Sequence, residues 1–172
     1  MKMQKTLGLL AGVALMPSAW AGTYLDADWA KQACDAWNKS ETLTQELGGD
    51  NWAGNNGGRG YKIIRLYREK CGPGSAVQLT ISQQDGKAIC TYGGKPTDEK
   101  LNDDMDYLMW ATYDDWQCMG RGDWGCGAMG AMMTGKLNFQ GPKGEAMGVM
   151  GPFNAFLQMM DDIPGDASQC PN

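Results

Sequence analysis

The spacing of apolar residues predicts a helix at the start of the folded part of the chain. Asp26 is a favoured helix N-cap residue, and Gly48-Gly49 ends the helical pattern. Between them, residues three and four positions apart form one apolar face, which holds Trp29, Ala33, Cys34, Trp37 and Leu47. The pattern therefore predicts one amphipathic helix between these two signals.

Three strands are predicted after that helix. Residues 61–69 are rich in aromatic and β-branched side chains, and residues 76–81 alternate between apolar and polar side chains. Asp85-Gly86 is a strong hairpin signal, so residues 87–92 return as the third strand. Because only one face of this meander is apolar, another layer must cover that face. The Gly- and Asn-rich segment 50–60 lacks the ligand pattern of a calcium loop, so we interpret it as a plain surface connection.

Shorter elements are predicted in the second half of the chain. Residues 106–111 fit a strand, although their periodicity leaves a helix open. Residues 126–133 predict a short helix, and residues 136–140 predict a strand. A longer helix is predicted over residues 142–163, where Met and Phe recur at helical spacing. Pro152 lies inside this pattern and predicts a kink or a break into two helices.

The first 21 residues are predicted to be a signal peptide, outside the fold. A basic start with two lysines precedes an apolar run over residues 7–16, and Ala19-Trp20-Ala21 matches a cleavage signature. The apolar run is shorter than the roughly 20 residues that span a membrane. We therefore expect cleavage near Ala21, a periplasmic or secreted protein, and a single folded domain over residues 22–172.

Charge narrows the range of partners. The whole chain has a net charge of −5, and without Lys2 and Lys5 the remaining chain has 13 basic and 20 acidic residues, a net charge of −7. Nucleic-acid binding needs clustered Lys and Arg, and strong docking on anionic lipid needs basic segments. We therefore expect no nucleic-acid partner. A hydrophobic small molecule or lipid fits better, and transient membrane contact remains open.

All six cysteines lie after residue 21, and an even number in an exported chain predicts up to three disulfides. The sequence does not choose among the possible pairings, but Cys118 and Cys126 flank a short loop and are the favoured pair. Closing so small a loop contributes about 2–3 kcal/mol on the chain-entropy model. The chain has no His and no C-x-x-C pair, so we expect no metal site and no cofactor.

Methionine is concentrated late in the chain, since all ten methionines after the predicted signal peptide lie at or after Met105. The flexible, polarisable Met side chain suits a pocket that adapts to ligands of varied shape. The same residues can also fill an irregular core. A further alternative is Cu(I) coordination by thioethers, although these residues occupy the apolar faces of predicted elements.

No pattern in the sequence supports catalysis. The absence of His removes the commonest general base, and the chain has no G-x-S-x-G motif. Its paired carboxylates are adjacent in sequence, so on a helix they point to different sides. We therefore expect a binding protein and not an enzyme.

The second half of the chain resembles the sterol-carrier-protein-2-like family. The matching segments are Tyr-Leu-Met-Trp-Ala at residues 107–111, Thr-Tyr-Asp-Asp-Trp at 112–116, Met-Thr-Gly-Lys-Leu at 133–137, and the helix after Gly141. In that family such a strand runs into a helix that starts at a residue like Thr112, so the resemblance favours a strand over 106–111. Thr112 and Asp115 also resemble a capping box, which places a helix over residues 113–119.

The resemblance implies an α+β fold with a five-stranded, largely antiparallel sheet, covered on one face by helices, and an apolar ligand tunnel. It implies a lipid-binding or lipid-transfer protein whose ligand is a sterol, a hopanoid, a fatty acyl lipid or a quinone. The cavity residues that we expect are Trp110, Met129, Met132, Met133, Leu137, Phe139, Met147, Met150, Phe153, Leu157 and Met160. The Cys118–Cys126 loop and the signal peptide depart from the family's intracellular members.

Two alternatives stay open. A domain that has lost its usable cavity would be a non-catalytic accessory protein that binds a protein partner, which an interior without a pocket of a few hundred Å³ would favour. A Met-rich Cu(I)-binding protein would need the sulfur atoms of three or more Met residues within reach of one point.

Overall fold

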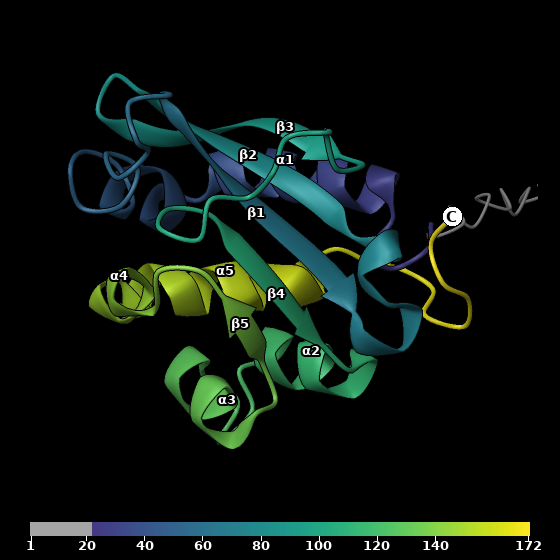
Figure 1. Cartoon of the computed structure of the whole chain (residues 1–172). Coiled ribbons are helices and arrows are strands. Elements are labelled where there is room, and N and C mark those ends of the chain that lie inside the picture. The colour runs from purple at the N-terminus through teal and green to yellow at the C-terminus, as the bar shows by residue number, and fades with distance from the viewer. Residues whose placement is uncertain (1–21) are drawn as a thin grey trace, which may run out of the picture.

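A five-stranded sheet forms the centre of the computed structural model, which describes residues 22–172 (Figure 1). Its strands are β1 (Tyr61–Arg68), β2 (Val77–Gln84), β3 (Lys87–Gly94), β4 (Tyr107–Ala111) and β5 (Asn138–Gln140). Their order is β3-β2-β1-β4-β5; β1 and β4 are parallel, and the other pairs are antiparallel. The predicted α+β class and largely antiparallel five-stranded sheet are confirmed. The predicted signal peptide lies outside the described residues.

Helices cover one face of this sheet. They are α1 (Ala27–Lys39), the π-helical turn η1 (Thr42–Glu46), α2 (Tyr113–Gly120), α3 (Ala128–Thr134), α4 (Lys143–Gly148) and α5 (Met150–Asp162), with 3₁₀ turns η2 (Glu69–Cys71) and η3 (Pro73–Ser75) after β1. In Figure 1, α1 and α5 lie behind the sheet, and α1 packs on β2 and β3. α2 follows β4 and packs on α5, while α3 and α4 flank the β5 end.

The predicted first helix is wrong in one respect, because it breaks at Ser40. The Ser40 backbone is extended, its Oγ accepts a hydrogen bond from the Leu43 N–H at 3.3 Å, and its carbonyl accepts one from the Thr44 N–H at 3.0 Å. Serine competes in this way with the continuing helix and starts a new turn. The apolar pattern holds across the break, since Trp29, Trp37 and Leu47 are all buried.

The last helix breaks into two, as its proline predicted, but the break lies at Val149. Pro152 then falls in the first turn of α5, where a missing N–H costs no intrahelical hydrogen bond. The predicted strand 136–140 is shortened to β5, and the segment 106–111 is a strand, as the family resemblance indicated.

Three fully buried tryptophans on the helices donate hydrogen bonds to carbonyl groups elsewhere in the fold. The Trp29 indole N–H donates to the Ile163 carbonyl at 3.1 Å, that of Trp37 to Ala88 at 2.9 Å, and that of Trp116 to Tyr67 at 3.3 Å. Each ring is therefore buried with its polar group satisfied, as large amphipathic side chains require.

Segment 95–106 crosses the opposite face of the sheet (Figure 1). Arg65 holds it there by donating hydrogen bonds to the carbonyls of Thr97 at 3.0 Å and Glu99 at 2.6 Å. The buried Asp106 carboxylate accepts from the Ile63 N–H at 2.7 Å and from the Arg59 guanidinium, which anchors the start of β4.

All six cysteines form disulfides, namely Cys34–Cys90, Cys71–Cys170 and Cys118–Cys126. The last is the pair that the sequence favoured. Three disulfides fit a periplasmic or extracellular protein, because such bonds persist in oxidising compartments. Among residues 22–172, no helix combines the length and the apolar character needed to cross a membrane.

Candidate functional site

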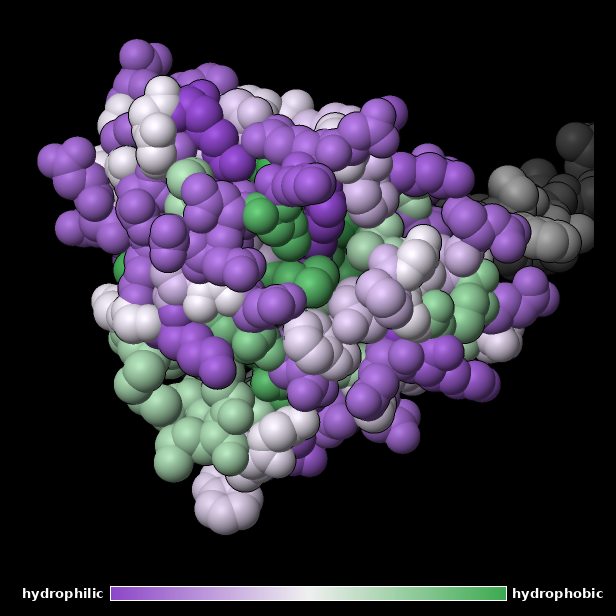
Figure 2. Space-filling model, viewed as in Figure 1, coloured by the Kyte–Doolittle hydropathy of each residue, from purple (hydrophilic) through white to green (hydrophobic). Residues whose placement is uncertain are grey.

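An open groove of about 430 Å³ follows the β5 edge of the sheet. Seven of the eleven predicted cavity residues line it: Trp110, Met129, Met132, Met133, Leu137, Phe139 and Met147. Figure 2 shows apolar side chains gathered over α3 and toward α4 on this side of the molecule. The groove therefore joins the Met-rich segment of the sequence to the end of the sheet.

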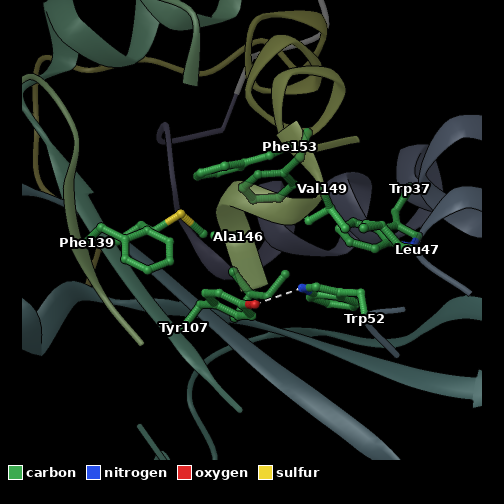
Figure 3. Close-up of a pocket in the computed structure, with 11 residues that line it drawn as sticks. Trp37, Leu47, Trp52, Tyr107, Phe139, Ala146, Val149 and Phe153 are labelled. Atoms are coloured by element: carbon green, nitrogen blue, oxygen red, sulfur yellow. Dashed lines mark hydrogen bonds between the residues drawn. The ribbon is translucent and has the colours of Figure 1, made fainter. Parts of the chain in front are cut away.

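A smaller pocket lies inside the molecule between the sheet and α5 (Figure 3). Its wall is largely aromatic and includes Trp37, Trp52, Tyr107, Phe139, Phe153 and Phe156. Its volume is about 30 Å³, enough for a water molecule, whereas sites for drug-sized ligands span about 300–1,000 Å³. The apolar tunnel that the resemblance implies therefore stays a prediction.

The four other predicted cavity residues lie away from the groove. Phe153 lines the interior pocket, where it packs against Phe139, with 6.0 Å between the ring centroids. Leu157 and Met160 are buried in the core, and Met150 is half-buried against it, outside both linings. Phe139 lines both the groove and the pocket, so the two hollows share one wall.

Helix α4 lies between these hollows. Its Ala146 faces the interior pocket, while Lys143 and Met147 face the groove. Glu145 faces a third, polar hollow of about 390 Å³ at the surface. α4 has only six residues and no side-chain cap at its N-terminus, so little of its stability comes from the helix itself.

A buried ion pair lies behind two aromatic rings that line the interior pocket. Lys62 is fully buried, and its Nζ lies 2.6 Å from Glu145 Oε2 and 3.3 Å from the Trp52 carbonyl oxygen. The Trp52 and Tyr107 rings cover the ammonium, with centroids 4.5 and 5.2 Å from Nζ. Aromatic faces attract a cation most strongly where water is excluded.

Hydrogen bonds complete this cluster. The Tyr107 hydroxyl donates to Glu145 and accepts from the Trp52 indole N–H at 2.9 Å (Figure 3), and the Asn55 amide donates to Glu145 Oε1 at 2.9 Å. Burial lowers the pKa of Lys62, and the hydrogen bond and charge of Glu145 oppose that shift. Burial also raises the pKa of Tyr107, and Glu145 raises it further. A charged, hydrogen-bonded cluster thus lies behind part of the aromatic wall of the pocket.

The sequence interpretation missed this buried ion pair and the residues around it. The prediction that segment 50–60 is a plain surface connection is wrong, since Trp52 and Ala53 are buried and Trp52 lines the pocket. One signal was present in the sequence, because Lys62 alternates with Ile64 and Leu66 and so shares their core-facing side of β1. A charged residue in such a row is unusual unless it is paired.

A comparison with protein-family models found no match, and no curated protein matched the sequence. Solved structures do match. The chain is similar to a crystal structure of sterol carrier protein 2, with a TM-score of 0.53 and 16% identity over 81% of this chain and 98% of that one.

Two solution structures also match. One is a conserved hypothetical protein of Thermus thermophilus, with a TM-score of 0.49 and 16% identity over 88% of this chain and 99% of that one. The other is sterol carrier protein domain 2 of Helicoverpa armigera, with a TM-score of 0.42 and 20% identity over 80% and 94%. The crystal structure, with its TM-score above 0.5, carries the conclusion. The fold is sterol-carrier-protein-2-like, as the sequence resemblance predicted.

Proposed function

We propose that this protein binds a hydrophobic ligand in the Met-lined groove and carries it between membranes or partners. The observation that carries the proposal is the groove of about 430 Å³, which lies within the range of ligand sites and is lined mainly by apolar side chains. Its methionines suit ligands of varied shape. The sterol-carrier-protein-2-like fold supports a lipid-binding role in general, and a sterol, a hopanoid, a fatty acyl lipid and a quinone all fit this chemistry.

The energetics suit exchange. Burial of a 16-carbon chain from water is worth about 13 kcal/mol, at roughly 0.8 kcal/mol for each CH₂ group. Transfer from a bilayer to an equally apolar groove cancels most of that gain. Uptake and release would then be nearly balanced. No bond is made or broken, so the proposed role is non-catalytic.

Transient membrane contact is part of this proposal. Trp124 is fully exposed in the loop that the Cys118–Cys126 disulfide closes, and Met133 is 80% exposed on the adjoining α3. Segment 124–135 contains no charged residue. Trp favours the interface between water and lipid, and the net charge of the chain argues against electrostatic docking. We expect Trp124→Ala to slow ligand transfer to phosphatidylcholine vesicles without weakening ligand binding.

Native mass spectrometry of the purified chain, followed by lipid extraction, tests the proposal first. A bound lipid at about one per chain would support it and identify the ligand class. Met132→Asp places a charge in the groove and should abolish uptake. Tyr92→Asp is the matched control, because Tyr92 is an exposed apolar residue on β3, at the other edge of the sheet. Equal uptake by both folded variants would contradict the groove assignment.

The accessory-protein alternative has one observation in its favour, which is the small volume of the interior pocket. A protein that takes up no lipid when several classes are offered would support that alternative. The Cu(I) alternative also stays a prediction, since four Met residues line the groove. Titration of the native protein with Cu(I) decides it.

We also propose that the protein is exported. The support comes from the three disulfides and from the signal-peptide pattern of the sequence. The intact mass of the protein from an exporting host should correspond to a chain that begins at Gly22. A retained leader would contradict the proposed cleavage site.

A further inference from the structure

The exposed methionines of residues 22–172 gather in the groove. This part of the chain contains ten methionines, and three of them are exposed: Met133 at 80%, Met147 at 53% and Met129 at 43%. All three line the groove, together with the half-buried Met132. They lie on α3 and α4, where Figure 2 shows apolar surface. A reagent dissolved in water therefore meets thioether sulfur mainly in the groove.

The other methionines of this part of the chain are better protected. Four are buried in the core and two are half-buried outside the groove, in that order Met109, Met119, Met159, Met160, Met105 and Met150. All six cysteines are held in disulfides, so no cysteine thiol of the chain competes for an oxidant. The groove thioethers are therefore the most accessible oxidisable sulfur in residues 22–172.

We propose that Met129, Met133 and Met147 form a modification site, at which a peroxide converts the thioethers to sulfoxides and thereby stops ligand uptake. This inference rests on the proposed function, because it names a means of regulation of the same groove. The proposed export would place the groove outside the reducing systems of the cytosol, where such oxidants are met.

The chemistry is reversible. The Met sulfur attacks one oxygen of hydrogen peroxide, the O–O bond breaks, and a sulfur–oxygen bond forms. Sulfur loses two electrons, and the other oxygen leaves as water with both protons. A methionine sulfoxide reductase reverses the change, because two of its thiols supply two electrons and two protons, form a disulfide, and release the oxygen as water.

Oxidation changes the groove and spares the core. A sulfoxide oxygen is a polar acceptor that binds water, and an apolar ligand that covers it removes this water without replacing the hydrogen bond. The affinity for an apolar ligand should therefore fall at least roughly tenfold. The fold should persist, since the four core methionines are at most 5% exposed.

The experiment measures oxidation and binding on the same sample. Purified native protein is treated with hydrogen peroxide, which catalase then removes. Intact mass gives the number of added oxygen atoms, at about 16 Da each, and peptide mapping locates them. Binding is followed with N-phenyl-naphthylamine, an uncharged apolar probe that becomes fluorescent in apolar sites. The first three oxygens should lie on Met129, Met133 and Met147, and probe affinity should fall as they appear.

Two variants are each compared with themselves before and after treatment. Met129→Leu/Met133→Leu/Met147→Leu keeps the groove apolar but removes its exposed sulfur, so peroxide should leave its probe affinity where it was. Met105→Leu/Met150→Leu is the matched control, because it removes the two half-buried methionines outside the groove. This control should lose affinity as the native protein does. Reductases for both sulfoxide epimers should restore binding, with untreated protein carried through the same step.

The outcomes separate the two proposals. Oxidised native protein that binds the probe as tightly as untreated protein overturns the modification site and leaves the lipid-binding proposal standing. Two other results also overturn the modification site: oxidation that begins at methionines outside the groove, or an equal loss of affinity in the triple Leu variant. An untreated native protein that binds neither the probe nor any lipid overturns both proposals.

Discussion

Replacement of Glu145 by glutamine tests the buried ion pair with Lys62 most directly. The variant keeps the shape of the side chain but leaves the Lys62 ammonium with the Trp52 carbonyl and two aromatic faces as its partners. Breaking a buried pair in this way costs about 3–5 kcal/mol. For a domain of this length each kcal/mol corresponds to roughly 2–4 °C, so the Tm should fall by about 6–20 °C.

A double-mutant cycle isolates the interaction. Lys62→Met leaves Glu145 hydrogen-bonded to Tyr107 and Asn55 and partly exposed, so its cost should be smaller, about 1–3 kcal/mol. The double variant Lys62→Met/Glu145→Gln should be close to Lys62→Met, because no buried charge remains. Unfolding in urea, followed by tryptophan fluorescence, gives the four free energies. Additive single effects would refute this account of the pair.

The pH dependence supplies a second check. Burial lowers the pKa of Lys62 from its ordinary value near 10.5. Between the lowered pKa and the ordinary one, the unfolded state binds more protons, so stability rises with pH. Without Glu145 the pH range over which Lys62 loses its proton in the folded state should widen. The free energy of unfolding that Glu145→Gln loses relative to the native protein should therefore be smaller at pH 9.5 than at pH 7. A deficit that stays constant over this range would contradict the expected loss of the Lys62 proton in this variant.

Three further predictions concern stability. Burial raises the pKa of Tyr24, so above about pH 10 the unfolded state loses the Tyr24 proton first and the free energy of unfolding falls. Urea unfolding at pH 8–11 should show a smaller fall for Tyr24→Phe than for the native protein. An equal fall in both would contradict the assignment. Replacement of both Cys34 and Cys90 by Ala should lower the free energy of unfolding by about 4 kcal/mol, given the sequence separation of 56. A loss below 1 kcal/mol in urea unfolding would contradict the chain-entropy reasoning. Gly93→Ala should destabilise the packing of α1 on β3, because its Cβ would lie 2.2 Å from the Ala30 carbonyl oxygen, whereas the Tm of the control Gly144→Ala should stay equal or rise, since that position is open.

The sequence predicted elements well where one physical rule acts alone. The alternation of Val77, Leu79 and Ile81 defines β2, and all three side chains are buried. The break at Ser40 was missed because the apolar pattern continues through it, whereas the side-chain hydrogen bond that ends the helix leaves no mark in hydrophobicity.

The groove residues could be inferred because methionines recur around β5 in the sequence and the fold keeps them together. The buried Lys62–Glu145 ion pair could not be inferred in the same way. Lys62 and Glu145 are 83 positions apart, and Trp52 comes from a loop whose polar composition conceals its burial. Only the pairing of β1 with β4, and the placement of α4 beside them, brings these groups into contact.

The Cys71–Cys170 disulfide sets an order of events during synthesis. Its cysteines are separated by 99 positions, whereas Cys118 and Cys126 are separated by only 8. A chain that enters an oxidising compartment from its N-terminus can close the short loop early, but Cys71 must wait until residue 170 has followed. A chain that stops before residue 170 would therefore lack the native partner of Cys71.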